Sequence, residues 1–317
     1  MTLTSPSPRS DLETLTELEP IVAKEIDRHL AAADEWFPHQ YVPWSQGRDY
    51  DGPMGGEGWE PGDSKVSAES REALLVNLLT EDNLPGYHAS LKLTLGQDGP
   101  WMWWANRWTA EENRHGIVIR DYLTVTRAID PIALERARMH HMQEGYDAAH
   151  GTDPIRGLAY VSFQELATRV SHRNTGKVSG DPFCEAMMTR VAKDENLHMI
   201  FYRNMLKAAF ELNPSATMCA VSDVVREFQM PGHAIDGFMR KSVQIAKAGI
   251  YDLRLHHDDV LSPVLRFWNV WDMEGLNAEG EQARLELSAF MQNLDEAATK
   301  FEDRRAAQRA RAEARQA

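Results

Sequence analysis

The chain has 317 residues, 43% of them hydrophobic, and a formal net charge of −14. A chain of this length can bury one large core, while its acidity argues against general nucleic-acid binding, which needs a basic surface. No run approaches the roughly 20 apolar residues of a membrane-spanning helix, and residues 1–9 lack the apolar core of a signal peptide.

The two cysteines, Cys184 and Cys219, are far apart and lie in apolar, helical-looking contexts. Isolated thiols suggest a reducing compartment rather than a disulfide framework. The sequence therefore predicts a cytoplasmic protein without a transmembrane segment.

The first third of the chain combines helical periodicity with one long loop. Residues 1–10 are rich in Ser and Pro, and we expect them to be disordered. A helix is predicted over 11–36, where Pro20 could introduce a kink. Residues 43–63 are dense in Gly, Pro and Asp, and loops of this length are usually functional. The apolar positions that recur at three- and four-residue spacing in the first helix are Leu15, Leu18, Ile21, Val22, Ile26 and Leu30.

Further helices are predicted over 67–94, with a bend at Pro85, and over 108–125. Asp-Pro pairs, which suit an N-cap followed by a first-turn proline, open a connecting helix to residue 149 and a helix over 182–212. A helix over 154–172 lies between them, and residues 221–228, 233–250 and 253–271 also look helical. A final helix rich in alanine and charge runs from residue 278 to 317. Because no alternating strand pattern competes, the sequence predicts an all-α protein with residues 1–317 as one domain.

Two copies of one motif lie within these helices. Glu112 precedes His115 by three residues, and Glu195 precedes His198 by three. Positions three apart lie on one helix face, so each pair can bind one metal ion. Glu81 and Glu165 lie about 30 residues upstream of Glu112 and Glu195 respectively, an interval that suits an antiparallel helix hairpin with ligands at the same height.

A doubled Glu … Glu-x-x-His pattern is the ligand set of di-iron or di-manganese carboxylate bundles. Four carboxylates and two imidazoles suit Fe(II) or Mn(II), and the absence of thiolates argues against structural zinc. A single pair would more often be an exposed helix face, but four carboxylates converging in a core are very costly without cations. The sequence therefore predicts a ferritin-like four-helix bundle with two iron ions, manganese being an alternative, and with additional flanking helices.

Each motif glutamate follows another acid, Glu111 or Asp194. A metal-bound histidine usually donates its second ring N–H to a carboxylate. We expect Asp194 to orient His115 and Glu111 to orient His198, across the approximate two-fold axis of the repeat. A solvent-facing acid is the alternative for both.

Four segments, over about residues 30–240, resemble the soluble acyl-acyl-carrier-protein (acyl-ACP) desaturases of the stearoyl-ACP 9-desaturase type. The resemblance implies a homodimeric ferritin-like bundle that uses O₂ and ferredoxin electrons to insert a cis double bond into an acyl chain on ACP. The segments are Glu81-Asp-Asn-Leu-Pro-Gly-Tyr87, Trp108-Thr-Ala-Glu-Glu-Asn-Arg-His-Gly116, Ser162-Phe-Gln-Glu-Leu-Ala-Thr168 and Asp194-Glu-Asn-Leu-His198.

Matched residue by residue, the family implies six iron ligands: Glu81, Glu112, His115, Glu165, Glu195 and His198. Thr168 matches a threonine beside the oxygen-binding side, although a helical threonine can equally bond its own backbone. Trp36 matches a tryptophan on the electron route towards Asp194 and His115, although it could be an ordinary core aromatic.

ACP and ferredoxin are acidic, so a chain with a charge of −14 needs a local basic patch to receive them. The densest basic run lies in the predicted C-terminal helix, although a solvated tail is the alternative. Its cations are Lys300, Arg304, Arg305, Arg309, Arg311 and Arg315; Arg240, Lys241 and Lys247 are other candidates.

Three other functions compete with desaturation. A hydroxylase or N-oxygenase would share the same metal ligands. A radical-generating ribonucleotide reductase subunit would carry a tyrosine four residues after the first ligand histidine, where this chain has Ile119. A ferritin-like metal-binding protein would be shorter and would not need the accessory helices.

Overall fold

The computed structural model describes residues 11–146, 151–230, 232 and 235–316. The disorder expected for residues 1–10 and the end of the connecting helix at 147–149 lie outside these residues. Within the described part the fold is helical, and the only extended pairing there is an isolated bridge between Tyr50 and Glu57. The predicted all-α class is confirmed.

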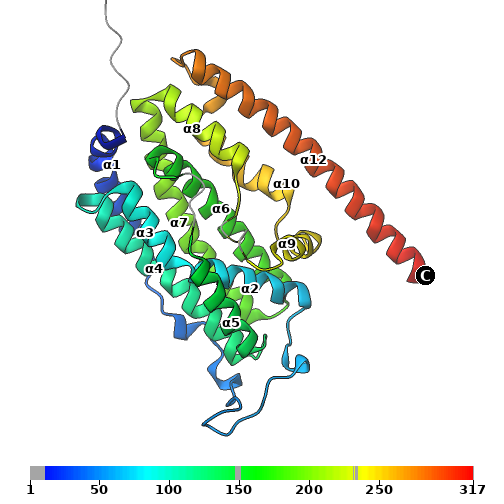
Figure 1. Ribbon diagram of the computed structural model, residues 1–317. Helices are drawn as coiled ribbons and strands as arrows, with labels where there is room; N and C mark the ends of the chain where they lie inside the picture. The colour runs from blue at the N-terminus through cyan, green and yellow to red at the C-terminus, as the bar shows by residue number, and fades with distance from the viewer. Residues whose placement is uncertain (1–10, 147–150, 231, 233–234, 317) are drawn as a thin grey trace, which may run out of the picture.

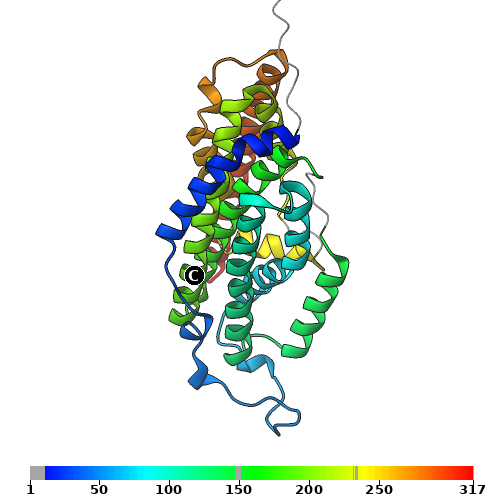
Figure 2. The same cartoon turned by 90° about the vertical axis from the view of Figure 1, so that its left-hand side faces the viewer.

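Helices α2, α4, α6 and α7 surround the centre of the molecule, and the other helices pack around or beyond them (Figures 1 and 2). The helices are α1 (Asp11–Ala32), α2 (Ala68–Asp82), α3 (Leu84–Leu95), α4 (Gly99–Val125), α5 (Pro131–Glu144), α6 (Pro154–Ser179), α7 (Pro182–Leu212), α8 (Pro214–Glu227), α9 (Phe238–Lys247), α10 (Leu253–Leu255), α11 (Ser262–Phe267) and α12 (Ala278–Gln316).

Aspartate caps begin three of these helices. Asp130, Asp153 and Asp181 each accept hydrogen bonds from backbone N–H groups in the first turn of α5, α6 and α7, and each precedes a proline. The caps satisfy N–H groups that have no partner within the helix. The predicted starts of α5 and α7 agree with the structure because they rest on this local chemistry. Two other predicted bounds differ: α4 begins nine residues before Trp108, and α6 continues past His172.

The helix predicted over 67–94 is divided in two. α2 ends at Asp82 and α3 begins at Leu84, with Pro85 in the first turn of α3. Proline has no N–H to donate to the carbonyl of Glu81, and its ring clashes there. The expected bend is therefore a full break, and it lies one turn beyond Glu81.

The buried face of α1 includes a polar residue. Leu15, Leu18, Val22 and Ile26 are buried as predicted, but Leu30 is 41% exposed. His29, which continues the same three- and four-residue spacing, is buried instead. Pro20 lies within the continuous helix α1.

After α8 the predicted helices are shorter and more broken than expected. The stretch predicted over 253–271 contains α10, a π-helical turn (His256–Leu261), α11 and a 3₁₀ turn (Val270–Asp272). Arg254 at this bend donates to Asp295 and Thr299 of α12, and Ala298 of α12 is fully buried. These contacts fix the middle of α12 to the bundle.

The C-terminal end of α12 extends past the helices against which it packs (Figure 1). Of the predicted partner-binding cations, Arg305 is engaged internally, donating to Asp252 and to the carbonyl of Ala246. Lys300 lies near Glu296 of its own helix, and Arg304 is exposed. Arg305 is therefore a poor candidate for partner binding, because its guanidinium serves to anchor α12.

The loop over 43–63 is held by Arg127, which bonds Asp63 and the carbonyl of Glu57. None of the helices among the described residues has the length and apolar character needed to cross a membrane.

Candidate metal centre

The six side chains predicted as metal ligands come together in the core, each from the helix expected to carry it. Two groups have ligand atoms close enough to hold one ion each: Glu81, Glu112, His115 and Glu195, and Glu112, Glu165, Glu195 and His198. Glu112 and Glu195 belong to both groups. The arrangement is that of a two-ion centre with two shared carboxylates.

The two histidines direct the same ring nitrogen towards the carboxylates. His115 Nδ1 lies 3.1 Å from Glu112 and 3.2 Å from Glu195. His198 Nδ1 lies 2.7 Å from Glu112 and 3.4 Å from Glu165. The Nδ1 atoms are therefore the ones available to metal ions between the carboxylates.

The outward ring nitrogens meet the two flanking acids. His115 Nε2 lies 3.4 Å from Asp194 Oδ2, and His198 Nε2 lies 2.8 Å from Glu111 Oε2. Both acids are buried. The contacts are those of the crossed pairing expected from the sequence, and they fix the orientation of both imidazoles.

Burial and mutual repulsion make this group of acids electrostatically strained. Burial, and then the charges of Glu112 and Glu195, raise the pKa of Glu165 well above its ordinary value. Burial would lower the pKa of His198, but the charge of Glu112 and the hydrogen bonds that the imidazole donates to the surrounding carboxylates raise it well above its ordinary value. The pKa of His115 is raised in the same way.

The donor set fits two iron ions. Glu165 Oε2 and Glu195 Oε1 are buried, and imidazole nitrogens 3.4 and 3.2 Å away do not form well-aligned hydrogen bonds with them. Carboxylate oxygens left in this way in a core are costly without a cation. Carboxylate oxygens and imidazole nitrogens suit ferrous iron. The Nε2 atoms of His115 and His198, which point away from the centre, contact Asp194 and Glu111. These contacts orient both imidazoles, as in well-formed metal sites.

Thr168 lies one turn after Glu165 and points towards the centre. Its hydroxyl lies 2.9 Å from Glu195 Oε2 and also 3.0 Å from the carbonyl of Glu165. The contact with the α6 backbone is the alternative that the sequence offered, and the place of Thr168 beside the oxygen-binding side stays a prediction.

Trp36 lies at the outer side of His115. Its indole N–H donates to Asp194 Oδ2 at 2.7 Å, and its ring stacks on the His115 ring with centroids 6.3 Å apart. The guanidinium groups of Arg114 and Arg190 lie over the indole at 4.9 and 5.6 Å. A contact path therefore leads from Trp36 through Asp194 to His115.

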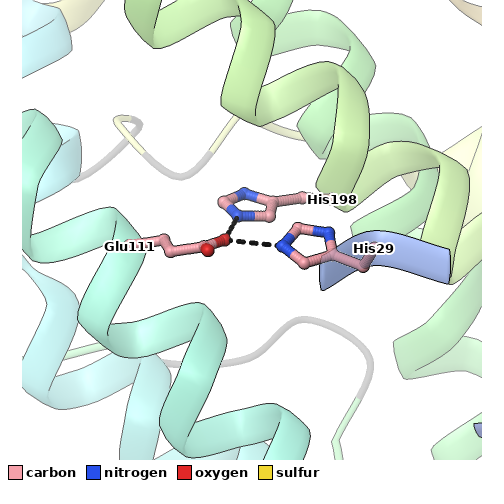
Figure 3. Close-up of side chains that lie close together, drawn as sticks. All are labelled: His29, Glu111 and His198. Carbon is pink, nitrogen blue, oxygen red and sulfur yellow. Dashed lines mark hydrogen bonds and ion pairs between the residues drawn. The ribbon is translucent and has the colours of Figure 1, made fainter. Parts of the chain in front are cut away.

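The sequence analysis missed His29. The Glu111 carboxylate lies at the side of the stacked His29 and His198 rings and accepts from both, His29 Nε2 lying 2.9 Å away (Figure 3). Burial raises the pKa of Glu111, but the hydrogen bonds from His198 and His29 outweigh it and leave that pKa far below its ordinary value. His29 lies three residues after the buried Ile26, and this spacing could have identified it.

His172 was missed as well. Its Nε2 lies 2.9 Å from Glu81 and 3.5 Å from Glu195. Burial would lower the pKa of His172, but the hydrogen bonds that it donates to Glu195 and Glu81 raise this pKa to about 9. His172 lies seven residues after Glu165, on the same face of α6, and this spacing could have identified it.

Three cavities have Glu81 in their walls, and two of these also share Thr80. The outer cavity, of about 450 Å³, reaches Thr168 and His172 and is closed on its far side by α9. The inner cavity, of about 50 Å³, lies beside Glu112 and is lined by Leu91, Trp108 and Tyr87 among others. The walls of these cavities contain no residue of the 43–63 loop.

A helical bundle with buried Glu and His ligands from four helices defines the class of ferritin-like di-iron carboxylate proteins. The family model described as "Fatty acid desaturase" matches residues 10–317. The chain belongs to the acyl-ACP desaturase family, whose members use a di-iron centre, and it is an oxidoreductase of that family.

Individual relatives agree. The chain is 46% identical over 303 residues to DesA1 of Mycobacterium tuberculosis, which bears the name of an acyl-[acyl-carrier-protein] desaturase, and the match covers 92% of this chain and 88% of that one. It is 32% identical over 227 residues to a chloroplastic stearoyl-[acyl-carrier-protein] 9-desaturase of Arabidopsis thaliana, covering 67% and 58%. The crystal structure of DesA2 from M. tuberculosis is similar with a TM-score of 0.69 and 28% identity, covering 85% and 98%.

Proposed function

We propose that the chain, as one domain over residues 1–317 and in the cytoplasm, inserts a cis double bond into a saturated acyl chain carried on ACP. It would use O₂ and electrons from a ferredoxin-type donor and would act as a homodimer. The observation that supports this most strongly is the convergence of six buried carboxylate and imidazole side chains in a chain of the acyl-ACP desaturase family.

The six predicted ligands divide between two iron ions. Glu81 and His115 would hold one iron, Glu165 and His198 the other, and Glu112 and Glu195 would bridge both. Iron supplies the oxidising power to remove hydrogen from alkyl C–H bonds, which are neither acidic nor polar enough for general acid–base catalysis. The ligands alone would also suit manganese, but the family's use of iron gives manganese no support.

The protein's own residues position and isolate the reaction. Asp194 and Glu111 hold the two imidazoles in one orientation, and the Thr168 hydroxyl holds Glu195. We propose that Trp36 and Asp194 form the path by which electrons reach His115. The arginines over Trp36 keep this path closely packed.

The two cavities give the acyl chain a place. A chain entering from the outer cavity would pass Thr80 and Glu81 and end among Leu91, Trp108 and neighbouring side chains. An enclosed apolar slot excludes water and presents one carbon pair to the centre, so that geometry selects which bond reacts.

Aerobic turnover of a saturated acyl-ACP, with iron-loaded protein and reduced ferredoxin, tests the proposal. Mass spectrometry of the product should reveal the loss of two hydrogens. A product heavier by one oxygen would instead identify a hydroxylase, and mineralised iron without any product would identify a storage protein.

A further inference from the structure

A groove on the outside of α6 and α7 is lined by four cations. Arg169, Arg173 and Lys177 lie at successive turns of α6, and Arg203 lies across from them on α7. The groove has a volume of about 490 Å³. None of Glu165, Thr168 and His172 lines the groove, and so the groove does not belong to the metal centre.

These cations lack the acidic partners that other basic residues of the described chain, such as Arg114, Arg138 and Arg190, have. None of the four forms a salt bridge with a described carboxylate, although the chain carries a net charge of −14. Asp259 is the one acid in the groove wall. Burial and the neighbouring Arg173 lower the pKa of Arg169, and burial and Arg28 lower that of Arg203, whose buried Nε has no hydrogen-bond partner.

The groove has an apolar floor beneath the cations. Leu166, Met199 and Val264 are buried there, and Val170 and Ile200 are half-buried. A small anion would leave this floor exposed to water. An amphipathic helix with carboxylates one turn apart would cover the floor and pair with the α6 cations, which span about 12 Å along the helix.

The groove is also close to the proposed entrance for the acyl chain. Tyr251 lines the outer cavity and Asp259 lines the groove, and these two residues are joined by α10 and the π-helical turn. The helical stretch from Leu253 to Asp259 rises about 9 Å and the two residues before it add at most about 7 Å, so the separation is within the reach of an extended phosphopantetheine arm. A carrier protein held in the groove could therefore place its acyl chain at the cavity.

We propose that this groove is the docking surface for an acidic helix of acyl carrier protein; the proposal rests on the desaturase function proposed above. A second copy of this chain fits less well. A two-fold interface brings the same patch of both subunits together, which would set these cations against one another. The C-terminal end of α12 is the rival docking surface. From Asp303 onwards it consists of charged residues, glutamine and alanine, and so it offers no comparable apolar floor.

The test compares two double charge reversals that change the net charge equally. R173E/K177E alters exposed groove cations, and K65E/R136E alters exposed cations outside the groove that form no salt bridge with a described carboxylate. Binding of holo-ACP at low salt should weaken at least about tenfold in the groove variant and less than about twofold in the control, because like charges then meet at the contact. A milder R173A/K177A variant should give an intermediate loss, and unchanged melting temperature and iron content would exclude misfolding.

Equal binding by the groove and control variants would overturn the proposal, as would a wild-type protein that does not bind ACP. A carrier lacking the phosphopantetheine arm should bind with the same sensitivity to R173E/K177E. If the wild-type protein does not bind that carrier, the groove instead recognises only the phosphate of the phosphopantetheine arm, and the proposed helix docking is wrong. A change of oligomeric mass in the groove variant would identify a contact between copies. Because binding is measured without turnover, a normal binding result with no desaturated product would overturn the proposed function alone.

Discussion

The two halves of the metal centre share one inner arrangement and differ in what surrounds it. On one side His115 meets Asp194 and then Trp36, whose ring stacks on His115. On the other side His198 meets Glu111 and then His29, whose ring stacks on His198 with centroids 5.8 Å apart. An indole thus occupies the place that an imidazole takes in the other half.

The charged groups around these rings differ too. Asp194 is bonded by Arg190 and Arg114, which also lie over Trp36. Glu111 accepts a hydrogen bond from Arg107 Nε on its other oxygen, Oε1. The predicted ligands are therefore arranged alike in the two halves, while Trp36 and His29 give the two imidazoles different buried neighbours.

The largest expected effect comes from removing a carboxylate that both halves share. Glu195→Ala should lower the iron content of reconstituted protein to below one ion per chain, because this oxygen donor belongs to both groups, whereas Glu81→Ala should retain one ion. Metal analysis measures the difference, with the exposed Glu185→Gln as the control. Two retained ions in Glu195→Ala would contradict the shared role.

The flanking acids should come next. Asp194→Asn and Glu111→Gln should each reduce iron affinity or turnover by about 10–100-fold, the usual cost of losing the partner of a metal-bound histidine. Equal iron-binding losses would show that the halves are equivalent in metal binding. Normal iron titration curves for both variants would rule out the orienting role.

Metal binding should release protons from both halves. The raised pKa values of His115 and His198 mean that both imidazoles are protonated in the metal-free protein at neutral pH. Metal must displace these protons, so affinity should rise with pH by about tenfold per pH unit for each proton displaced. Titration with iron in a weakly buffered indicator dye measures the release, and an affinity independent of pH between about 6 and 8 would contradict it.

Matched substitutions of Trp36 and His29 test the difference between the halves. Trp36→Phe should slow reduction of the ferric centre by about tenfold without changing its iron content, since the hydrogen bond to Asp194 is lost. His29→Phe should leave the reduction rate unchanged and weaken iron binding a few-fold. Stopped-flow reduction by ferredoxin separates these results; equal slowing by both variants would mean that electrons have no preferred side.

The smallest effect should come from Thr168. Thr168→Val removes the hydrogen bond to Glu195, worth about 1 kcal/mol, and should reduce turnover about fivefold. Thr168→Ser, which keeps the hydroxyl, should restore most of the activity. If Thr168→Val turns over at the wild-type rate, the hydroxyl serves only the backbone of α6.

Much of the centre could be predicted because its signals are local. Three-residue spacing on a helix places Glu112 with His115, and Glu195 with His198, whatever the rest of the chain does. Asp-Pro caps likewise set the starts of α5, α6 and α7 from two adjacent residues. The sequence by itself thus determined the ligand pairs, the all-helical class and the family.

Tertiary packing decided what lies around those pairs. His29 and His172 reach the centre from α1 and from a later turn of α6, and only the packing of helices brings them to Glu111 and Glu81. Arg305, one of the basic residues in the C-terminal run, is used to anchor α12 to Asp252. Helical periodicity specifies neighbours within a turn or two, but which face meets which helix depends on the packing of side chains from distant parts of the chain.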